Sequence, residues 1–213
     1  MAYISDLKKI LGQSYDFNTH DNLFGTSLSD TINVYGGNDR VYAYGGNDVI
    51  FDVRSYSGGN SGTDAIYGGT GNDLYFVDEV GDEVIELAGE GTGDYAYAHI
   101  SYTLPEHVEG LGLLGGSVNL NADLNGTGNA LNNKLVGNHG SNVLDGGAGV
   151  DELQGGGGND LLVGGSENDL LFGQDGDDDL FGDAGDDELQ GGLGNDNLLG
   201  GTGIDFLLGQ EGA

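Results

Sequence analysis

Residues 146–208 read GGAGVDELQ, GGGGNDLLV, GGSENDLLF, GQDGDDDLF, GDAGDDELQ, GGLGNDNLL and GGTGIDFLL. Each of these seven units has nine residues, with aspartate at position six and leucine at position eight. The aspartates are Asp151, Asp160, Asp169, Asp178, Asp187, Asp196 and Asp205. Carboxylates held at a fixed interval repel one another unless a cation neutralises them, and calcium prefers several oxygen ligands. The stretch therefore predicts a calcium-binding repeat structure.

A shorter set of similar units precedes this stretch, in residues 25–76. The units are GTSLSDTIN, VYGGNDRVY and AYGGNDVIF, followed, after the insertion DVRSYSG, by GNSGTDAIY and GGTGNDLYF. Their position-six residues are Asp30, Asp39, Asp48, Asp64 and Asp73. Two further units, in residues 128–145, carry Asn133 and Asn142 at this position. Because asparagine lacks the charge, we expect a hydrogen-bonded stack without metal there rather than a calcium site.

The repeats divide the chain into four segments. These are an N-terminal cap (residues 1–24), a first repeat block (25–76), an irregular β-solenoid connector (77–127) and a second repeat block (128–213). GDYAYAHISY and DEVIEL alternate in the connector as strands do, so we expect further coils there, not a separate globular domain. SDLKKIL, in residues 5–11, predicts a short capping helix. The final GQEGA repeats the start of a unit, so we expect a piece of a longer protein.

Composition sets limits on function. The chain has 36 acidic and 5 basic residues, a formal charge of −31, with 45 glycines and no cysteine. This charge argues against nucleic-acid binding, which needs a basic surface. Composition alone also fits a disordered acidic tail, but the constant register over seven units argues against that reading. The absence of cysteine excludes disulfides and fits a cytosolic protein or one exported unfolded.

The period also predicts how one unit folds. We expect the first six residues to turn tightly at their glycines and the last three to form a short strand whose middle residue points inward. Two units then make one coil, and coils stack as parallel strands. One side of the stack carries Asp151, Asp169, Asp187 and Asp205, and the other carries Asp160, Asp178 and Asp196. Burying one leucine per unit does not offset the loss of backbone entropy when the nine residues of that unit become ordered. We therefore expect cation binding and folding to be one event.

The units GGAGVDELQ, GGGGNDLLV and GGTGNDLYF resemble the RTX, or hemolysin-type, calcium-binding nonapeptide repeat. The segments GDEVIEL, ISYTLPEHVEGLGLLG and GTGNALNNKLVGN are similar to those that join repeat blocks in large secreted RTX proteins. The resemblance implies an all-β parallel β-roll, a right-handed β-solenoid with two repeats per coil and calcium in its turns. It also implies folding outside the cell after unfolded export by a type I secretion apparatus. We expect a secreted, extracellular monomer with calcium as its partner.

The resemblance further implies a ligand set. In the family, two aspartates share an ion with carbonyls at positions two and four of one coil and one and three of the next. In the first block the resemblance implies the pairs Asp30–Asp48, Asp39–Asp64 and Asp48–Asp73. Together with the pairs between successive aspartates on each side of the second block, about eight Ca²⁺ would bind in all. The insertion before Asp64 weakens its pairing, and Glu167, at position four, either distorts its turn or adds a ligand. The expected carbonyl ligands in the second block are those of Gly147, Gly149, Gly156, Gly158, Gly164, Gly165, Ser166, Gly173, Asp175, Gly176, Gly182, Ala184, Gly185, Gly191, Leu193, Gly200 and Thr202.

Two functional hypotheses follow. His-Glu-x-x-His, Gly-x-Ser-x-Gly and cysteine are all missing from the sequence, so we do not expect an enzyme. The first hypothesis is a structural calcium module, acting as folding switch and spacer in a secreted toxin, adhesin or exoenzyme. The alternative is a module that binds glycans or a host cell surface, like the β-roll modules of alginate epimerases. The acidic stretch of residues 146–208 has no Lys or Arg to bind an acidic glycan, only Phe172, Phe181 and Phe206, which favours the first hypothesis. The tyrosines of the first block keep the second hypothesis open for neutral glycans: Tyr35, Tyr42, Tyr44, Tyr67 and Tyr75.

Overall fold

The structure, a computed structural model, describes residues 20–34, 36–52, 62–115 and 121–211. Within these ranges all regular structure is β-strand, so the predicted all-β class is confirmed. The capping helix predicted for residues 5–11, and most of the predicted cap, lie outside the described residues. Among the described residues, no helix has the length and apolar character needed to cross a bilayer.

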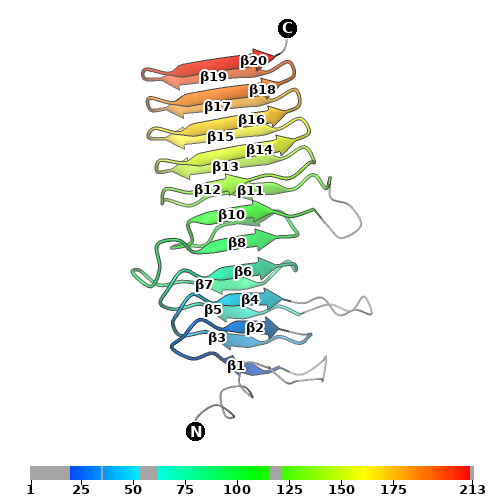
Figure 1. The fold of residues 1–213 in the computed structure, drawn as a ribbon, viewed down its shortest axis with the longest axis vertical. Coiled ribbons are helices and arrows are strands. Elements are labelled where there is room, and N and C mark those ends of the chain that lie inside the picture. Colours follow the sequence, from blue (N-terminus) through cyan, green and yellow to red (C-terminus); the bar gives the residue numbers. More distant parts are fainter. Residues whose placement is uncertain (1–19, 35, 53–61, 116–120, 212–213) are drawn as a thin grey trace. The chain divides into compact units, whose positions relative to one another are not determined.

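The described residues fall into two compact units. The first unit contains residues up to Tyr97 and Pro105–Val108. Its strands form two rows, in the orders β1-β3-β5-β7 and β2-β4-β6-β8 (Figure 1). All but the last residue of β8 belongs to this unit. The strands are β1 (Asn22–Phe24), β2 (Thr31–Val34), β3 (Arg40–Tyr42), β4 (Val49–Asp52), β5 (Ala65–Tyr67), β6 (Leu74–Val77), β7 (Glu83–Ile85) and β8 (Tyr95–Ala98).

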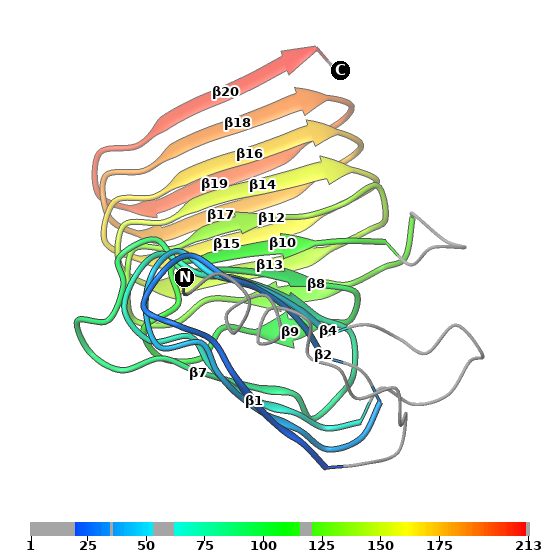
Figure 2. The same ribbon diagram turned by 60° about the horizontal axis from the view of Figure 1, so that its bottom comes forward.

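The second unit contains Ala98–Leu104 and the residues from Glu109 onward. Its strands again alternate between two rows, in the orders β9-β11-β13-β15-β17-β19 and β10-β12-β14-β16-β18-β20. Figure 2 shows the strands of each row following one another in a stack. The strands are β9 (Tyr102–Thr103), β10 (Gly110–Leu113), β11 (Asn125–Thr127), β12 (Lys134–Val136), β13 (Val143–Ala148), β14 (Glu152–Gly157), β15 (Leu161–Ser166), β16 (Leu170–Asp175), β17 (Asp179–Ala184), β18 (Glu188–Leu193), β19 (Asn197–Thr202) and β20 (Phe206–Glu211).

Strand pairing within each unit is parallel and follows the repeat period. Leu153 pairs with Leu171, and Ile32 pairs with Ile50, each one coil of 18 residues further on. Ile50 pairs with Tyr75, 25 residues on, because the inserted residues lengthen this coil without shifting the register of its strands. The predicted parallel β-roll with two repeats per coil is confirmed.

The strands of the second unit are longer than predicted. From β13 to β20 each has six residues, covering positions seven to nine of one unit and one to three of the next. The expectation of a six-residue turn is therefore wrong here. Residues at position two remain paired with the neighbouring strand although their φ is positive, as Gly147 is paired with Gly165. In the first unit, by contrast, the strands have three or four residues.

Inward side chains at position eight line the core of each unit, as predicted. In the second unit they form a column that is fully buried from β12 to β18: Leu135, Leu144, Leu153, Leu162, Leu171, Leu180 and Leu189. In the first unit the corresponding residues are Ile32, Val41, Ile50, Ile66 and Tyr75. Position-one residues of this unit, Val34, Ala43 and Val77, are fully buried as well and widen its core.

Candidate calcium sites in the turns

The position-six aspartates link successive coils by a recurring hydrogen bond. The backbone N–H of Asp151 donates to Oδ1 of Asp169 at 2.8 Å, and that of Asp160 donates to Oδ1 of Asp178 at 2.7 Å. The same bond joins every other pair that the resemblance implies: Asp30–Asp48, Asp39–Asp64, Asp48–Asp73, Asp169–Asp187, Asp178–Asp196 and Asp187–Asp205. The Asp39–Asp64 pair is thus intact despite the insertion. Within each unit the linked carboxylates therefore form two columns, each made of the aspartates of alternate repeats.

The second carboxylate oxygen has no protein partner in most of these residues. Oδ2 is buried and accepts no hydrogen bond in Asp48, Asp64, Asp73, Asp151, Asp160, Asp169, Asp178, Asp187 and Asp196. Buried polar atoms are nearly always satisfied, so a repeated exception needs a ligand to explain it. An oxygen anion without a donor is suited to bind a cation.

In the second unit, glycine at position one keeps open a narrow space beside each of these oxygens. At Gly173, an added Cβ would lie 2.6 Å from the carbonyl oxygen of Gly191 and would also clash with Asp178 Oδ2. At Gly146 the same two kinds of oxygen lie around the glycine, those of Asp151 and Gly164. Carboxylate and carbonyl oxygens converging on one small space are the donor set that calcium takes. The residues present therefore fit this ion.

The carbonyl ligands predicted for the second block occupy two settings. Those at positions one to three lie in strands β13 to β19, where residues at positions two and three pair with their equivalents in a neighbouring coil, as Ser166 does with Ala184. Those at position four, such as Gly176 and Gly185, lie in the turns. The carbonyls of Leu193 and Thr202 already accept the N–H groups of Gly176 and Gly185 at 2.8 and 3.0 Å. A carbonyl has two lone pairs, so one remains for an ion.

Burial raises the pKa of these carboxyl groups. Loss of hydration is the main cause, and the backbone N–H bond to Oδ1 partly offsets it. The pKa rises to about 7 in Asp64, Asp160 and Asp169. It rises to about 6 in Asp48, Asp73, Asp151 and Asp178. Without a cation, the columns therefore bind protons more readily than exposed carboxyl groups do, and a bound cation would oppose this shift.

Comparison with known families agrees with this geometry. The model of the RTX calcium-binding nonapeptide repeat (4 copies) matches residues 17–51, 59–76, 127–162, 154–189 and 190–213, together more than half of the chain. The chain belongs to this RTX repeat family. It is an RTX β-roll module, and calcium is its ligand. A search of curated proteins finds no match.

The two asparagine units of the roll use their side chains differently from the aspartates. The side-chain amide of Asn142 donates to the carbonyl of Leu124 at 2.7 Å, and that of Asn133 donates to Asn129 Oδ1 at 3.2 Å. Oδ1 of Asn142 accepts the N–H of Asn138 at 2.8 Å. The predicted hydrogen bonding of these asparagines is thus observed. That their turns bind no metal stays a prediction.

Three further aspartates, which were not predicted from the sequence, extend the carboxylate columns of the first unit. The N–H of Asp21 donates to Asp39 Oδ1 at 2.8 Å, that of Asp64 to Asp82 Oδ1 at 3.1 Å, and that of Asp73 to Asp94 Oδ1 at 2.7 Å. Asp21 and Asp82 stand 18 residues from their partners, so the period held the signal for both. Asp94 stands 21 residues from Asp73, and this longer coil conceals it in the sequence.

Glu167 neither distorts its turn nor turns its carboxylate toward the ion space. It adopts φ +74°, in the left-handed region that the glycine usual at this position would occupy at no steric cost. Its Oε2 accepts the N–H of Gly149 at 3.0 Å and the hydroxyl of Ser166 at 2.7 Å. Glu167 therefore joins its own turn to the preceding one through its side chain.

Proposed function

We propose that this RTX β-roll is a calcium-dependent folding switch that serves as a structural spacer in a larger secreted protein. The observation that carries this proposal is the double column of buried Oδ2 atoms without hydrogen-bond partners. A column of buried carboxylates opposes folding when it is ionised and supports folding when each pair holds Ca²⁺. The cation therefore decides which state is populated.

The proposal accounts for the composition of the chain. A formal charge of −31 keeps the calcium-free chain expanded, and the absence of cysteine avoids cross-links during passage through a narrow channel. Calcium is scarce in the cytosol and reaches millimolar levels outside cells. A site tuned to that difference leaves the chain unfolded for export through a type I secretion apparatus and folds it afterwards. We also propose a monomer without catalytic activity of its own.

The test is far-UV circular dichroism during a calcium titration from a chelated start, with magnesium as the control. We expect a cooperative transition from coil to β-structure with calcium and none with magnesium, which retains its water and fits such cages poorly. A chain that is already β-structured in chelator would overturn the switch. Isothermal titration calorimetry on the same sample counts the ions, which we expect to number about eight or more.

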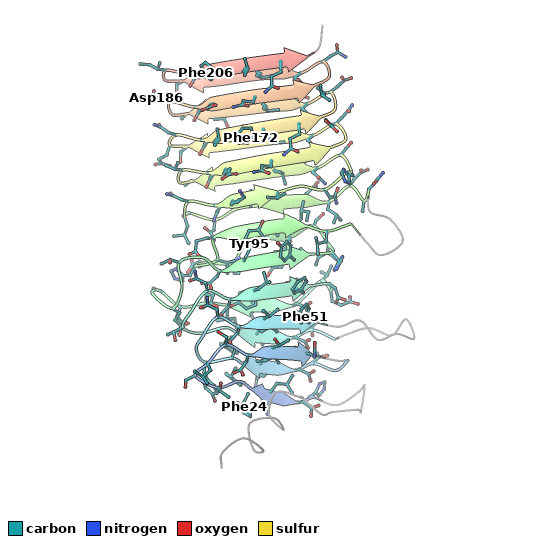
Figure 3. The ribbon with its side chains drawn as sticks, in the orientation of Figure 1. Phe24, Phe51, Tyr95, Phe172, Asp186 and Phe206 are labelled. Atoms are coloured by element: carbon teal, nitrogen blue, oxygen red, sulfur yellow. The ribbon has the colours of Figure 1, made fainter. Side chains whose placement is uncertain are left out.

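A second candidate function, glycan binding, is favoured by a row of stacked aromatic rings in the first unit. Tyr42 stacks on Phe24 at 5.5 Å and on Tyr67 at 4.9 Å between ring centroids. Phe24 and Tyr44 are 45% and 57% exposed, so part of the row faces solvent (Figure 3). Flat exposed rings suit the apolar faces of neutral sugars. Of the tyrosines predicted for this role, Tyr75 is buried in the core, and Tyr35 lies outside the described residues.

A glycan array with calcium present tests this second candidate. Binding of a neutral glycan that is lost in Tyr44→Ala and kept in Phe172→Ala, a second-unit control, would support it. Binding that survives Tyr44→Ala would place the glycan elsewhere. Because both variants retain every position-six aspartate, calcium-induced folding serves as the check on their integrity.

A further inference from the structure

The first unit contains a group of three carboxylates that differs from the paired aspartates. Asp73 precedes β6, Glu86 follows β7 and Asp94 precedes β8 (Figure 1). Each places a carboxylate oxygen within 4.8 Å of the oxygens of the other two. All three side chains are at least nine-tenths buried, with exposed fractions of 1%, 5% and 0%. Three acidic groups therefore share one enclosed volume.

Glu86 occupies the place that a backbone carbonyl occupies in the regular coils. At Gly182, an added Cβ would meet the carbonyl oxygen of Gly200, 18 residues on, at 2.6 Å. At Gly68, the residue 18 positions on is Glu86, and the added Cβ would meet the hydroxyl oxygen of Tyr75 and, next to it, the side-chain Oε1 of Glu86. The same Cβ would lie 2.6 Å from Asp73 Oδ2. A neutral ligand of the regular site is thus replaced by a charged one.

Two oxygens of the group are unsatisfied within the protein. Asp73 Oδ2 and Glu86 Oε2 are buried and accept no hydrogen bond. The other oxygen of Glu86, Oε1, is held by the hydroxyl of Tyr75, which points inward from β6. Tyr75 therefore positions Glu86 through one oxygen and leaves the other without a hydrogen-bond donor. Beside Asp94, an added Cβ at Gly91 would clash with the carbonyl oxygen of Gly71, so a backbone oxygen also lies close to this aspartate.

We propose that Glu86 joins the paired aspartates Asp73 and Asp94 to form a three-carboxylate calcium site, and that this site binds Ca²⁺ more tightly than the turns with two carboxylates. Calcium affinity rises with the number of charged ligands, and this site has three carboxylates where a regular turn has two. The site is thus the first to fill as calcium rises, and it joins the coils of β6, β7 and β8 in the first unit. This inference rests on the proposed calcium switch, since it assigns an order to the loading of the roll.

The decisive comparison uses calcium titration calorimetry on three full-length proteins: wild type, Glu86→Gln and Glu83→Gln. Glu83 is exposed on β7, so its variant removes one charge from the same segment without touching the site. We expect wild type to show one class of site about ten-fold tighter than the rest. Glu86→Gln, which keeps the acceptor for Tyr75, should lose that class, and Glu83→Gln should keep it. A Glu86→Gln titration that matches wild type would overturn the proposal.

Terbium luminescence tests where the first ion binds, independently of how tightly calcium binds there. Terbium(III) replaces calcium at oxygen sites and emits when a nearby tyrosine is excited, and the chain has no tryptophan to interfere. We expect the first equivalent of terbium to emit strongly in wild type and much less in Tyr75→Phe, which retains all three carboxylates. Unchanged emission from the first equivalent would place the tightest site elsewhere.

The outcomes separate this proposal from the folding switch. If calcium folds the chain while Glu86→Gln retains the tight class, the switch stands and the three-carboxylate site is wrong. If calcium binds but leaves the chain as coil, the switch fails on its own. If Glu86→Gln does not fold, crystals of the wild type soaked in terbium decide, because an anomalous peak among the three carboxylates supports the site and its absence overturns it.

Discussion

The two units of the roll reach the same turn chemistry with different regularity. In the second unit every coil from β13 onward repeats at 18 residues, the strands have six residues and the core is a column of leucines. In the first unit the interval is 18, 21 or 25 residues, the strands are short, and Ile, Val and Tyr share the core. The bond from an aspartate N–H to the Oδ1 of the next coil is nevertheless present in both. Aspartate pairing therefore tolerates variation in turn length, and the uniform period is a property of the second unit alone.

The largest expected effect comes from removing a shared aspartate in the regular unit. Oδ1 of Asp169 accepts the N–H of Asp151, and the backbone N–H of Asp169 donates to Asp187, so this residue belongs to two pairs. Asp169→Asn keeps the Oδ1 acceptor and removes the charge from both. We expect the calcium concentration at half-folding to rise about ten-fold or more, measured by circular dichroism. Asp186→Asn, an exposed control in the equivalent turn one coil on, should leave the midpoint in place (Figure 3).

Asp48→Asn tests whether the irregular unit depends on its aspartates equally. Asp48 also serves two pairs, with Asp30 and Asp73. We expect a similar rise in the calcium midpoint, confined to the tyrosine near-UV signal of the first unit. No change in that signal would show that the first unit is held by its aromatic contacts and not by its carboxylates.

Acid should substitute for calcium in both units. Burial raises the pKa of Asp64 in the first unit and of Asp160 in the second to about 7, above the ordinary value of 3.8. A folded-state pKa above the unfolded one gives stability that is fully present below about pH 4 and lost as pH rises through about 7. In chelator, circular dichroism should therefore show β-structure appearing as pH falls from 8 to 4. β-structure that grows with rising pH would contradict the buried-carboxylate account.

A core truncation should cost less and should depend on position within the column. Leu162→Ala removes a fully buried side chain and is expected to lower the free energy of unfolding in excess calcium by about 3 kcal/mol. Leu207 is 42% exposed, and Leu207→Ala should cost about 1 kcal/mol or less. Urea unfolding at fixed calcium measures both. Equal costs would show that Leu207 is buried in solution.

The smallest effect concerns the side chain at a left-handed turn position. Glu167→Gly relieves the positive φ of Glu167 but loses its bonds to Gly149 and Ser166, so we expect a net change within about 1 kcal/mol. Gly165→Ala is the contrasting variant, since Gly165 has φ +113° and an added Cβ would clash with the carbonyl of Gly147. It should destabilise by about 2 kcal/mol. Thermal unfolding in calcium compares them.

Sequence predicted the parts of the molecule that keep the period. The pairing of Asp151 with Asp169, and the inward leucines, follow from the 18-residue coil alone. Strand length was underestimated because glycine at positions one and two suggested a turn, while ladder pairing keeps these residues extended. Asp94 was missed because its coil is longer, and the role of Tyr75 because an aromatic at position eight gave no sign that its hydroxyl would meet Glu86. Contacts between coils of unequal length are set by three-dimensional register, which local spacing does not encode.

The hydrogen bond between coils always points the same way along the chain. The donor is the N–H of the earlier aspartate and the acceptor is Oδ1 of the later one, in the first unit as in the second. A stack built this way has polarity, like a filament whose two ends are chemically unlike. The end nearer the N-terminus presents the acceptor groups of this bond, the carboxylate oxygens. The opposite end presents its donor groups, the backbone N–H groups. Each added coil therefore completes the turn before it and leaves a new one open.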